Sequence, residues 1–136
     1  NAHMNNGRYL TLMDLGRFDL MTQCGLVGVV LRQRWFPIAG GVMVRFERPL
    51  HAFEKITLKS SILGWDDKWL YFRHDILTGD TRAARATTRG LFRTRGQSVP
   101  TADLLDAMNY DGAPMPPPDS VRQWGRADEL MRGEDE

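Results

Sequence analysis

A mostly apolar helix is predicted near the start of the chain. One set of apolar or small residues recurs at helical spacing, namely Tyr9, Leu12, Met13, Gly16 and Leu20, and other faces carry Leu10, Leu15, Phe18 and Met21. A helix that is apolar nearly all round is usually buried on more than one side. We therefore expect a central helix over residues 7–25, with Asn5 or Asn6 as its N-cap and Gly25 as its C-terminal stop.

The middle of the chain alternates between apolar and polar residues with period two, which predicts four strands. The alternating runs cover residues 42–47, 55–62, 69–76 and 84–93. Short breaks between them suggest that consecutive strands are antiparallel neighbours. One face is apolar and needs the helix as a cover, with small residues at 84, 86 and 90 allowing a close approach. The other face is basic and carries Arg45, Lys55, Lys59, Arg73, Arg85, Arg89 and Arg93. The pattern predicts an α+β protein in which one antiparallel sheet wraps around one long central helix.

The last third of the chain predicts two more helices around a stiff connection. Pro100 and Thr101 open a short helix, and residues 114–118 (Pro-Met-Pro-Pro-Pro) form an extended linker. Asp119 can then cap a final helix in which Val121, Trp124 and Met131 share a side. So short and charged a helix is marginal alone, so we expect it to dock on the domain or on a partner.

Length and composition point to one globular domain with a tail. The chain has 136 residues, of which 42% are hydrophobic and 26% charged, and this excludes a disordered or disulfide-dense protein. The longest apolar run, residues 25–31, is too short to span a membrane, and we see no secretory leader. With a single cysteine, Cys24, there is no internal disulfide. We therefore expect a cytoplasmic protein that is not bound to a membrane.

The basic residues are mostly arginine, 15 of 18. Arginine binds phosphate and carboxylate with two parallel hydrogen bonds, so the bias hints at a phosphorylated or acidic ligand, whereas a GC-rich genome is the alternative explanation. The net charge is only +1, and aromatic residues are not interleaved with the arginines of residues 82–95, so we expect no nucleic acid partner.

Several common catalytic signatures are absent from the sequence. There is no G-x-S-x-G elbow, P-loop or G-x-G-x-x-G motif. His3, His51 and His74 lie far apart without metal-ligand spacing, so we expect no metal site. Cys24, at the end of the predicted helix, fits a buried small hydrophobic residue better than a nucleophile.

The opening motif, residues 3–10 (His-Met-Asn-Asn-Gly-Arg-Tyr-Leu), resembles that of the hotdog-fold acyl-CoA thioesterases in the 4-hydroxybenzoyl-CoA thioesterase-like branch. Asp14 and Arg17 match residues that often follow in the family's central helix. The resemblance continues through residues 45–50 and Val99-Pro100. It covers residues 1–108, which we take as the hotdog domain, and leaves residues 109–136 as a Pro-rich linker with a helical tail.

This resemblance implies a fold with one more strand. The family has a strand before the motif, which we expect to lie outside the numbered chain. In many enzymes of the branch an aspartate four residues before the motif histidine is the nucleophile or general base, and that position falls before Asn1.

The resemblance also implies a catalytic role for the motif. Backbone N–H groups at a helix N-terminus stabilise a developing oxyanion, and Asn6, Gly7 and Arg8 would supply them. The side chains of Asn5 and Asn6 can hold a water or the thioester oxygen, although N-capping explains them equally well. His3 can relay a proton or simply make a loop hydrogen bond.

Two further residues, Asp14 and His74, have a structural and a catalytic interpretation. For Asp14 we favour an ion pair with Arg17, with a general-base role as the alternative. His74 fits a hydrogen-bonded core histidine better than a catalytic group. Tyr9, the aromatic residue of the motif, is expected to contact substrate.

The resulting hypothesis is an acyl-CoA thioesterase that forms a carboxylic acid and CoA. Coenzyme A is then part of the substrate, and no cofactor is expected. Its phosphates suit Arg85 and Arg89, although most such arginines are solvated charges or subunit contacts. The resemblance implies a homodimer or homotetramer with the acyl pocket between subunits. The alternative is a non-catalytic hotdog module that binds acyl-CoA or a protein partner.

Overall fold

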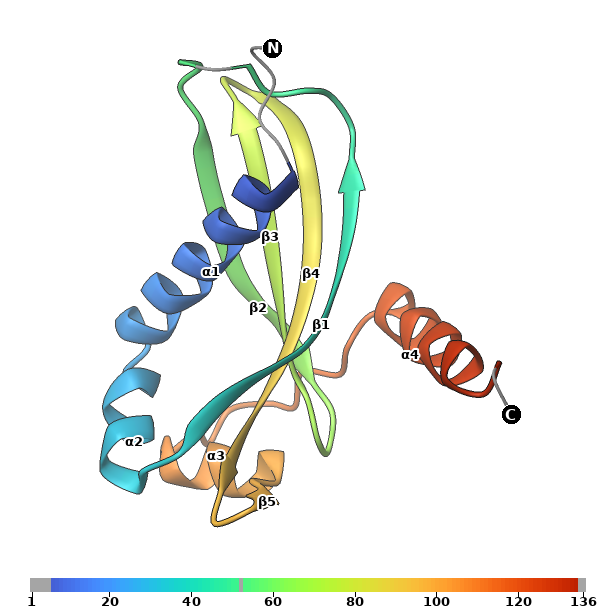
Figure 1. The fold of residues 1–136 in the computed structure, drawn as a ribbon. Coiled ribbons are helices and arrows are strands. Elements are labelled where there is room, and N and C mark those ends of the chain that lie inside the picture. The colour runs from blue at the N-terminus through green and yellow to red at the C-terminus, as the bar shows by residue number, and fades with distance from the viewer. Residues whose placement is uncertain (1–5, 52, 135–136) are drawn as a thin grey trace.

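A computed structural model describes residues 6–51 and 53–134 and shows a curved antiparallel sheet with a long helix along one face (Figure 1). The sheet is formed by β1 (Phe36–Phe46), β2 (Thr57–Trp65), β3 (Leu70–Thr78), β4 (Thr81–Thr94) and the short β5 (Gln97–Ser98). All four predicted strands are therefore confirmed, with β1 and β4 longer than their alternating patterns. This is the hotdog arrangement that the opening motif implied.

The neighbour relations in the sheet differ from the prediction at one place. The strand order is β1-β4-β3-β2, and β5 pairs with β4. The hairpins β2–β3 and β3–β4 are antiparallel neighbours as expected, but β1 and β2 lie at opposite edges of the sheet. Alternation predicts which face a residue occupies, but it does not specify which strand lies beside which. The expectation that all consecutive strands pair was therefore wrong for β1 and β2.

The central helix is α1 (Asn6–Gln23), and it ends where the sequence predicted. Gly25 takes φ +83°, a left-handed conformation that stops a helix at low cost. A second helix that we did not expect, α2 (Leu26–Gln33), follows directly and buries Leu26 and Val29. Cys24, at this junction, is exposed, so its assignment as a buried residue was wrong.

The inner face of the sheet and α1 enclose the core. One cluster of buried residues gathers around the first half of α1, and it consists of Tyr9, Met13, Leu50, Ile76, Ala83, Ala84 and Ala86. A second cluster lies towards α2 and contains Leu26, Leu70, Phe72, Phe92, Val99 and Leu104. The small residues Ala84 and Ala86 are buried in the first cluster with Tyr9 and Met13, but the close approach of α1 is to β2. Gly16 is necessary for it, because a Cβ there would overlap Ser60 and Leu58 of β2.

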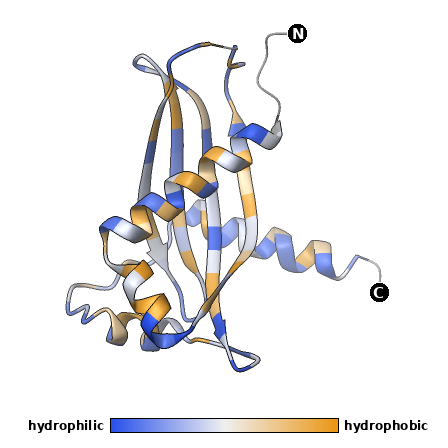
Figure 2. Cartoon of the chain, turned by 60° about the vertical axis from the view of Figure 1, so that its left-hand side comes forward, coloured by the Kyte–Doolittle hydropathy of each residue, from blue (hydrophilic) through white to orange (hydrophobic). Residues whose placement is uncertain are grey.

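The outer side of α1 is less covered than an all-round apolar helix predicts. The side chains of Leu10, Leu15 and Phe18 are 46%, 60% and 62% exposed. Figure 2 shows apolar positions on the side of α1 that faces away from the sheet. Within the described residues, α1 is thus buried mainly on its sheet side, and its outer side is suited to a further contact.

The C-terminal third follows the predicted order of elements. It forms α3 (Thr101–Ala107) and α4 (Asp119–Arg132), with Pro118 rather than Asp119 at the N-cap position of α4. The connection between them is anchored to β2, since the Trp65 N–H donates to the Met115 carbonyl at 2.9 Å.

The final helix docks on the outer face of the sheet, opposite α1. Val121 is buried, and Trp124 and Asp128 contact Arg89 of β4. Met131, which we had placed on the same side, is 63% exposed. In the described part of the chain, no helix has both the length and the apolar character needed to cross a membrane.

Candidate functional site

The N-terminal turn of α1 contains most of the predicted site. In the described residues α1 runs from Asn6, so Gly7 and Arg8 lie in its first turn, where the backbone N–H groups point out of the N-terminal end of the helix. These groups and the helix dipole favour negative charge at this end. His3 and Asn5 lie outside the described residues, as does the side chain of Asn6. Their assigned roles stay predictions.

Tyr9 anchors this turn to the sheet. Its side chain is 3% exposed, and its ring packs edge-on against Phe46 at the end of β1, with ring centres 5.0 Å apart. Burial raises the pKa of the hydroxyl, which also makes a hydrogen bond with the Leu50 backbone. The tyrosine therefore fixes the position of the helix start, while its expected contact with substrate stays a prediction.

The loop between β1 and β2 brings polar groups near this turn that the sequence did not single out. The carboxylate of Glu54 accepts the His51 N–H at 3.0 Å and lies 3.7 Å from a guanidinium nitrogen of Arg48. Its charge also acts to raise the pKa of Tyr9. Phe53, beside it, is fully exposed. The sequence of this loop has no regular spacing of apolar and polar residues, so it did not predict this arrangement.

Asp14 and Arg17 form the predicted ion pair on α1. The Asp14 Oδ1 to Arg17 Nη2 distance is 2.7 Å. The Asp14 carboxylate lies at the surface, with 68% of its side chain exposed. Only 21% of the Arg17 side chain is exposed, and Arg17 is one of the residues that line an apolar cavity. Arg17 therefore contacts an exposed carboxylate on α1 and also forms part of the cavity wall.

The cavity lies between the second half of α1 and the inner faces of β1, β3 and β4. Its volume is about 170 Å³, and its walls include Met21, Ile38, Leu70, Phe72, Leu91 and Phe92. Apolar cavities of about 150 Å³ are large enough to accept a benzene ring. The cavity is therefore suited to an apolar group. Alternation predicted that Leu70, Phe72 and Phe92 face inward, but not that a space remains beside them.

His74, on the same inner face, is fully buried and hydrogen-bonded on both sides. Its Nδ1 lies 2.7 Å from Ser60 Oγ and its Nε2 3.2 Å from Thr88 Oγ1. Burial lowers its pKa to about 4, with a smaller effect from the charge of Arg17 in the same direction. The ring is therefore neutral near pH 7, and the interpretation as a satisfied core histidine is confirmed.

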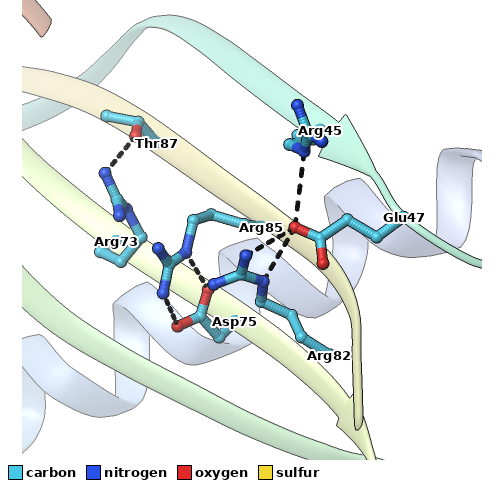
Figure 3. A network of polar contacts seen from close by, with 7 residues as sticks. All are labelled: Arg45, Glu47, Arg73, Asp75, Arg82, Arg85 and Thr87. Atoms are coloured by element: carbon cyan, nitrogen blue, oxygen red, sulfur yellow. Dashed lines mark hydrogen bonds and ion pairs between the residues drawn. The ribbon is translucent and has the colours of Figure 1, made fainter. Parts of the chain in front are cut away.

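Arg85 lies on the opposite face of the sheet from α1. It donates to both carboxylate oxygens of Asp75, at 2.7 and 2.9 Å, and lowers the pKa of that carboxyl. Figure 3 shows this pair beside a second one, in which Arg82 contacts Glu47. Arg85 is therefore not brought together with the start of α1.

Arg89 lies on the same outer face and is largely buried. It is 8% exposed and forms an ion pair with Asp128 of α4 at 3.0 Å. Neither Arg89 nor Arg85 faces the cavity. Their assignment to substrate binding stays a prediction.

Metal ligation finds no support in the described residues. They contain no group of three or more His, Cys, Asp or Glu side chains placed to hold a metal ion. The described site thus consists of a helix N-terminus, a neighbouring polar loop and an apolar cavity.

Comparison with known proteins agrees with this arrangement. Residues 1–125 match the thioesterase-like superfamily. The chain belongs to this family. The match runs into α4, past residue 108, where the resemblance of the opening motif ended. Among curated relatives, protein THEM6 of Drosophila melanogaster is 27% identical over 131 residues, covering 94% of this chain and 65% of that protein. The chain thus spans less than two thirds of the length of this relative.

Solved structures show the same fold. The probable thioesterase YbaW from Escherichia coli superposes with a TM-score of 0.70 at 15% identity, covering 80% of this chain and 86% of that one. A 1,4-dihydroxy-2-naphthoyl-CoA thioesterase from Synechocystis gives 0.63 at 11% identity, covering 81% and 85%. The family and the hotdog fold are therefore both established.

Proposed function

We propose that this chain is the catalytic domain of a thioesterase that hydrolyses an acyl-CoA to a carboxylic acid and CoA. The observation that carries the proposal is the placement of two features on the same face of the sheet. The N-terminal turn of α1 lies at one end of β1, through the contact of Tyr9 with Phe46, and the apolar cavity lies at the other end, beside residues 37–39. Family membership supports the same reaction class.

The proposal includes a homodimer that joins these two features into one site. Within a chain they are far apart, since the ten helical steps from Gly7 to Arg17 span about 15 Å. The outer edge of β1 is unpaired among the described strands and carries exposed apolar side chains, namely Phe36, Ile38, Val42 and Phe46. Such an edge favours pairing with another strand.

Two-fold pairing of β1 with its copy would place complementary parts together. If the strands run antiparallel about an axis near Gly41, residues 37–39 of one chain lie opposite residues 43–45 of the partner subunit, next to Phe46 of the partner subunit. The cavity of one chain then faces the N-terminal turn of α1 in the other. The exposed outer side of α1, with Leu15 and Phe18, is suited to a further contact that would make a homotetramer.

In the proposed reaction, the acyl group occupies the cavity and the thioester carbonyl points at the N-terminal turn of α1. Water adds to the carbonyl carbon, and the N–H groups of Gly7 and Arg8 stabilise the oxyanion. The carbon–sulfur bond then breaks, the acid keeps the oxygen of water, and CoA leaves as a thiol. In this scheme Asn5 and Asn6 hold the water or the carbonyl, His3 relays the proton, and Asp14 is a candidate base.

The remaining parts of the proposal concern phosphate binding and location. For Arg85 and Arg89 to bind the phosphates of CoA, a phosphate would have to compete with Asp75 and Asp128. A cytoplasmic location is in keeping with one free, exposed cysteine.

The test is a panel of short, long and aromatic acyl-CoAs, incubated with the full natural protein, with thiol release followed by a colorimetric reagent. We expect turnover of at least one thioester and a loss of turnover in Asn6→Ala. Saturable binding of acyl-CoA without CoA release by a folded dimer would instead favour the non-catalytic module.

A further inference from the structure

The edge strand β1 is irregular at one point, beside the cavity. Ala39 pairs with Gly90 and Gly41 pairs with Arg89, so Gly40 is the extra residue of a β-bulge. A bulge leaves its extra residue outside the regular ladder and bends the strand. The Nε of Arg89 donates to the Gly40 carbonyl at 3.1 Å. A side chain of the neighbouring strand therefore satisfies the group that the bulge displaces.

Arg89 is itself held by α4. Its Nη2 lies 3.0 Å from Oδ2 of Asp128, and its guanidinium carbon lies 4.7 Å from the ring centre of Trp69 and 4.8 Å from that of Trp124. A guanidinium that is only 8% exposed needs such partners to offset its desolvation. The planar fork lets one side chain reach a carbonyl, a carboxylate and two rings at once.

The two indole rings also contact the bulge directly. A Cβ at Gly40 would overlap the ring of Trp69, and a Cβ at Gly41 would lie 3.1 Å from the ring of Trp124. Gly41 has φ +151°, which residues with side chains rarely adopt. The bulge is thus fixed on the outer face by one ring from the β2–β3 loop and one from α4.

The same segment of β1 is a wall of the apolar cavity on its inner face. Pro37, Ile38 and Ala39 line the cavity together with Gly90 and Leu91 of β4. Gly90 lies close to β1, since a Cβ there would be 3.3 Å from the Ile38 carbonyl oxygen. A shift of the bulge would move this wall, and a change of one methylene group in an apolar pocket alters discrimination roughly tenfold.

We propose that Arg89 and the C-terminal helix α4 form a clasp that positions the β1 bulge and so sets the width of the cavity and its acyl-chain preference. Arg89 and Asp128 are positioning residues in this scheme, because they reach the acyl group only through the backbone of residues 37–41. The inference rests on the proposed function for the nature of the ligand, but the clasp itself does not.

The experiment compares Asp128→Asn with Glu129→Gln in the full natural protein. Both changes remove one carboxylate from α4, but Glu129 is exposed. Hydrogen exchange is measured on peptides that cover β1. Affinity is measured for a chain-length series of acyl-CoA thioether analogues, which cannot be hydrolysed. Turnover is measured for the matching thioesters.

In Asp128→Asn we expect faster hydrogen exchange in residues 38–42 than in the natural protein, and unchanged exchange in the β2–β3 hairpin. We also expect the ratio of affinities for long-chain and short-chain analogues to change roughly tenfold. KM for long-chain thioesters should change while kcat for the shortest accepted thioester stays the same. Arg89→Lys should give the same faster exchange in residues 38–42. Asp128→Glu should restore much of the natural profile, and Glu129→Gln should match the natural protein.

If hydrogen exchange in β1 of Asp128→Asn equals that of the natural protein, α4 does not position the bulge and the proposal is wrong. If exchange is faster but the preference for acyl-chain length is unchanged, the clasp has no role in specificity. If the natural protein binds the analogues but turns over no thioester, the proposed function fails, while the affinity series still decides the inference. Failure of the natural protein to bind any analogue would contradict both.

Discussion

The ring of Tyr9, in the first turn of α1, packs edge-on against Phe46, the last residue of β1. This contact places the anion-attracting end of the helix at one end of the edge strand. The apolar cavity lies at the other end, beside Ile38. The separation within one chain is the reason that the proposed site needs two copies.

Tyr9 should contribute to stability mainly through its ring. Tyr9→Ala removes a buried aromatic side chain and should lower the free energy of unfolding by about 3–5 kcal/mol. Tyr9→Phe keeps the ring contact with Phe46 and loses only the hydrogen bond with Leu50, so its cost should be about 1 kcal/mol. Urea denaturation of the two variants measures the difference. Equal costs would show that the hydroxyl, rather than the packing, fixes the helix start.

The backbone N–H of Gly7 should contribute to catalysis. Proline is tolerated in the first turn of a helix, so Gly7→Pro removes this donor without breaking α1. Removal of one oxyanion donor typically costs roughly 100-fold in kcat. Gly7→Ala is the matched control, because it keeps the N–H and should keep the activity. A proline variant with full kcat for acyl-CoA would exclude this donor from the reaction.

The apolar edge of β1 should hold the dimer together. Val42 is 41% exposed near the middle of the strand, and Val42→Lys would place two charges close to the proposed two-fold axis. We expect a monomer by sedimentation and a loss of thioester hydrolysis. The same substitution at Leu130, which is exposed on α4, should leave the mass of the natural assembly unchanged. A dimeric Val42→Lys protein would place the subunit contact elsewhere.

His74 should make stability depend on pH. Its pKa is about 4 in the folded chain and 6.5 when unperturbed, so the unfolded state binds the proton more readily. The contribution of the neutral ring is complete above pH 6.5 and decreases as the pH falls towards 4. The shift corresponds to about 3 kcal/mol.

Denaturation of the natural protein and of His74→Gln at pH 7.5 and pH 4.5 tests whether stability falls with decreasing pH because of His74. The glutamine keeps polar atoms near Ser60 and Thr88 but does not titrate, so its stability should fall less between the two pH values. Equal decreases would mean that other groups cause the acid sensitivity.

Much of the inner face could be predicted from the sequence, because alternation reflects burial directly. Phe72, His74 and Ile76 alternate with polar neighbours, and all three are buried beneath α1. The stop of α1 at Gly25 followed from local chemistry in the same way. The pairing of β1 with β4 could not be predicted, since it depends on a connection that crosses from one edge of the sheet to the other.

The role of Arg89 also lay beyond the sequence. The sequence pattern predicts only that Arg89 is one more positively charged residue on the outward face of a strand. Its partners Gly40 and Asp128 are 49 and 39 residues away along the chain. The cavity is a similar case, because alternation places Phe72 and Phe92 on the inner face without showing how well they fill it. Long-range contacts and packing therefore account for most of what was missed.

The central claim is that each site combines the cavity of one chain with the helix N-terminus of another. It is tested most directly by mixing two inactive variants of the full protein, Gly7→Pro and Ala39→Trp, the second of which fills the cavity. Each variant alone should remain a dimer without thioester hydrolysis.

After the subunits exchange, half of the dimers contain one chain of each kind, and one of their two sites is intact. The mixture should therefore recover about a quarter of the natural activity. A mixture that stays inactive, although mixed dimers are present, would show that each site lies within a single chain and would contradict the account.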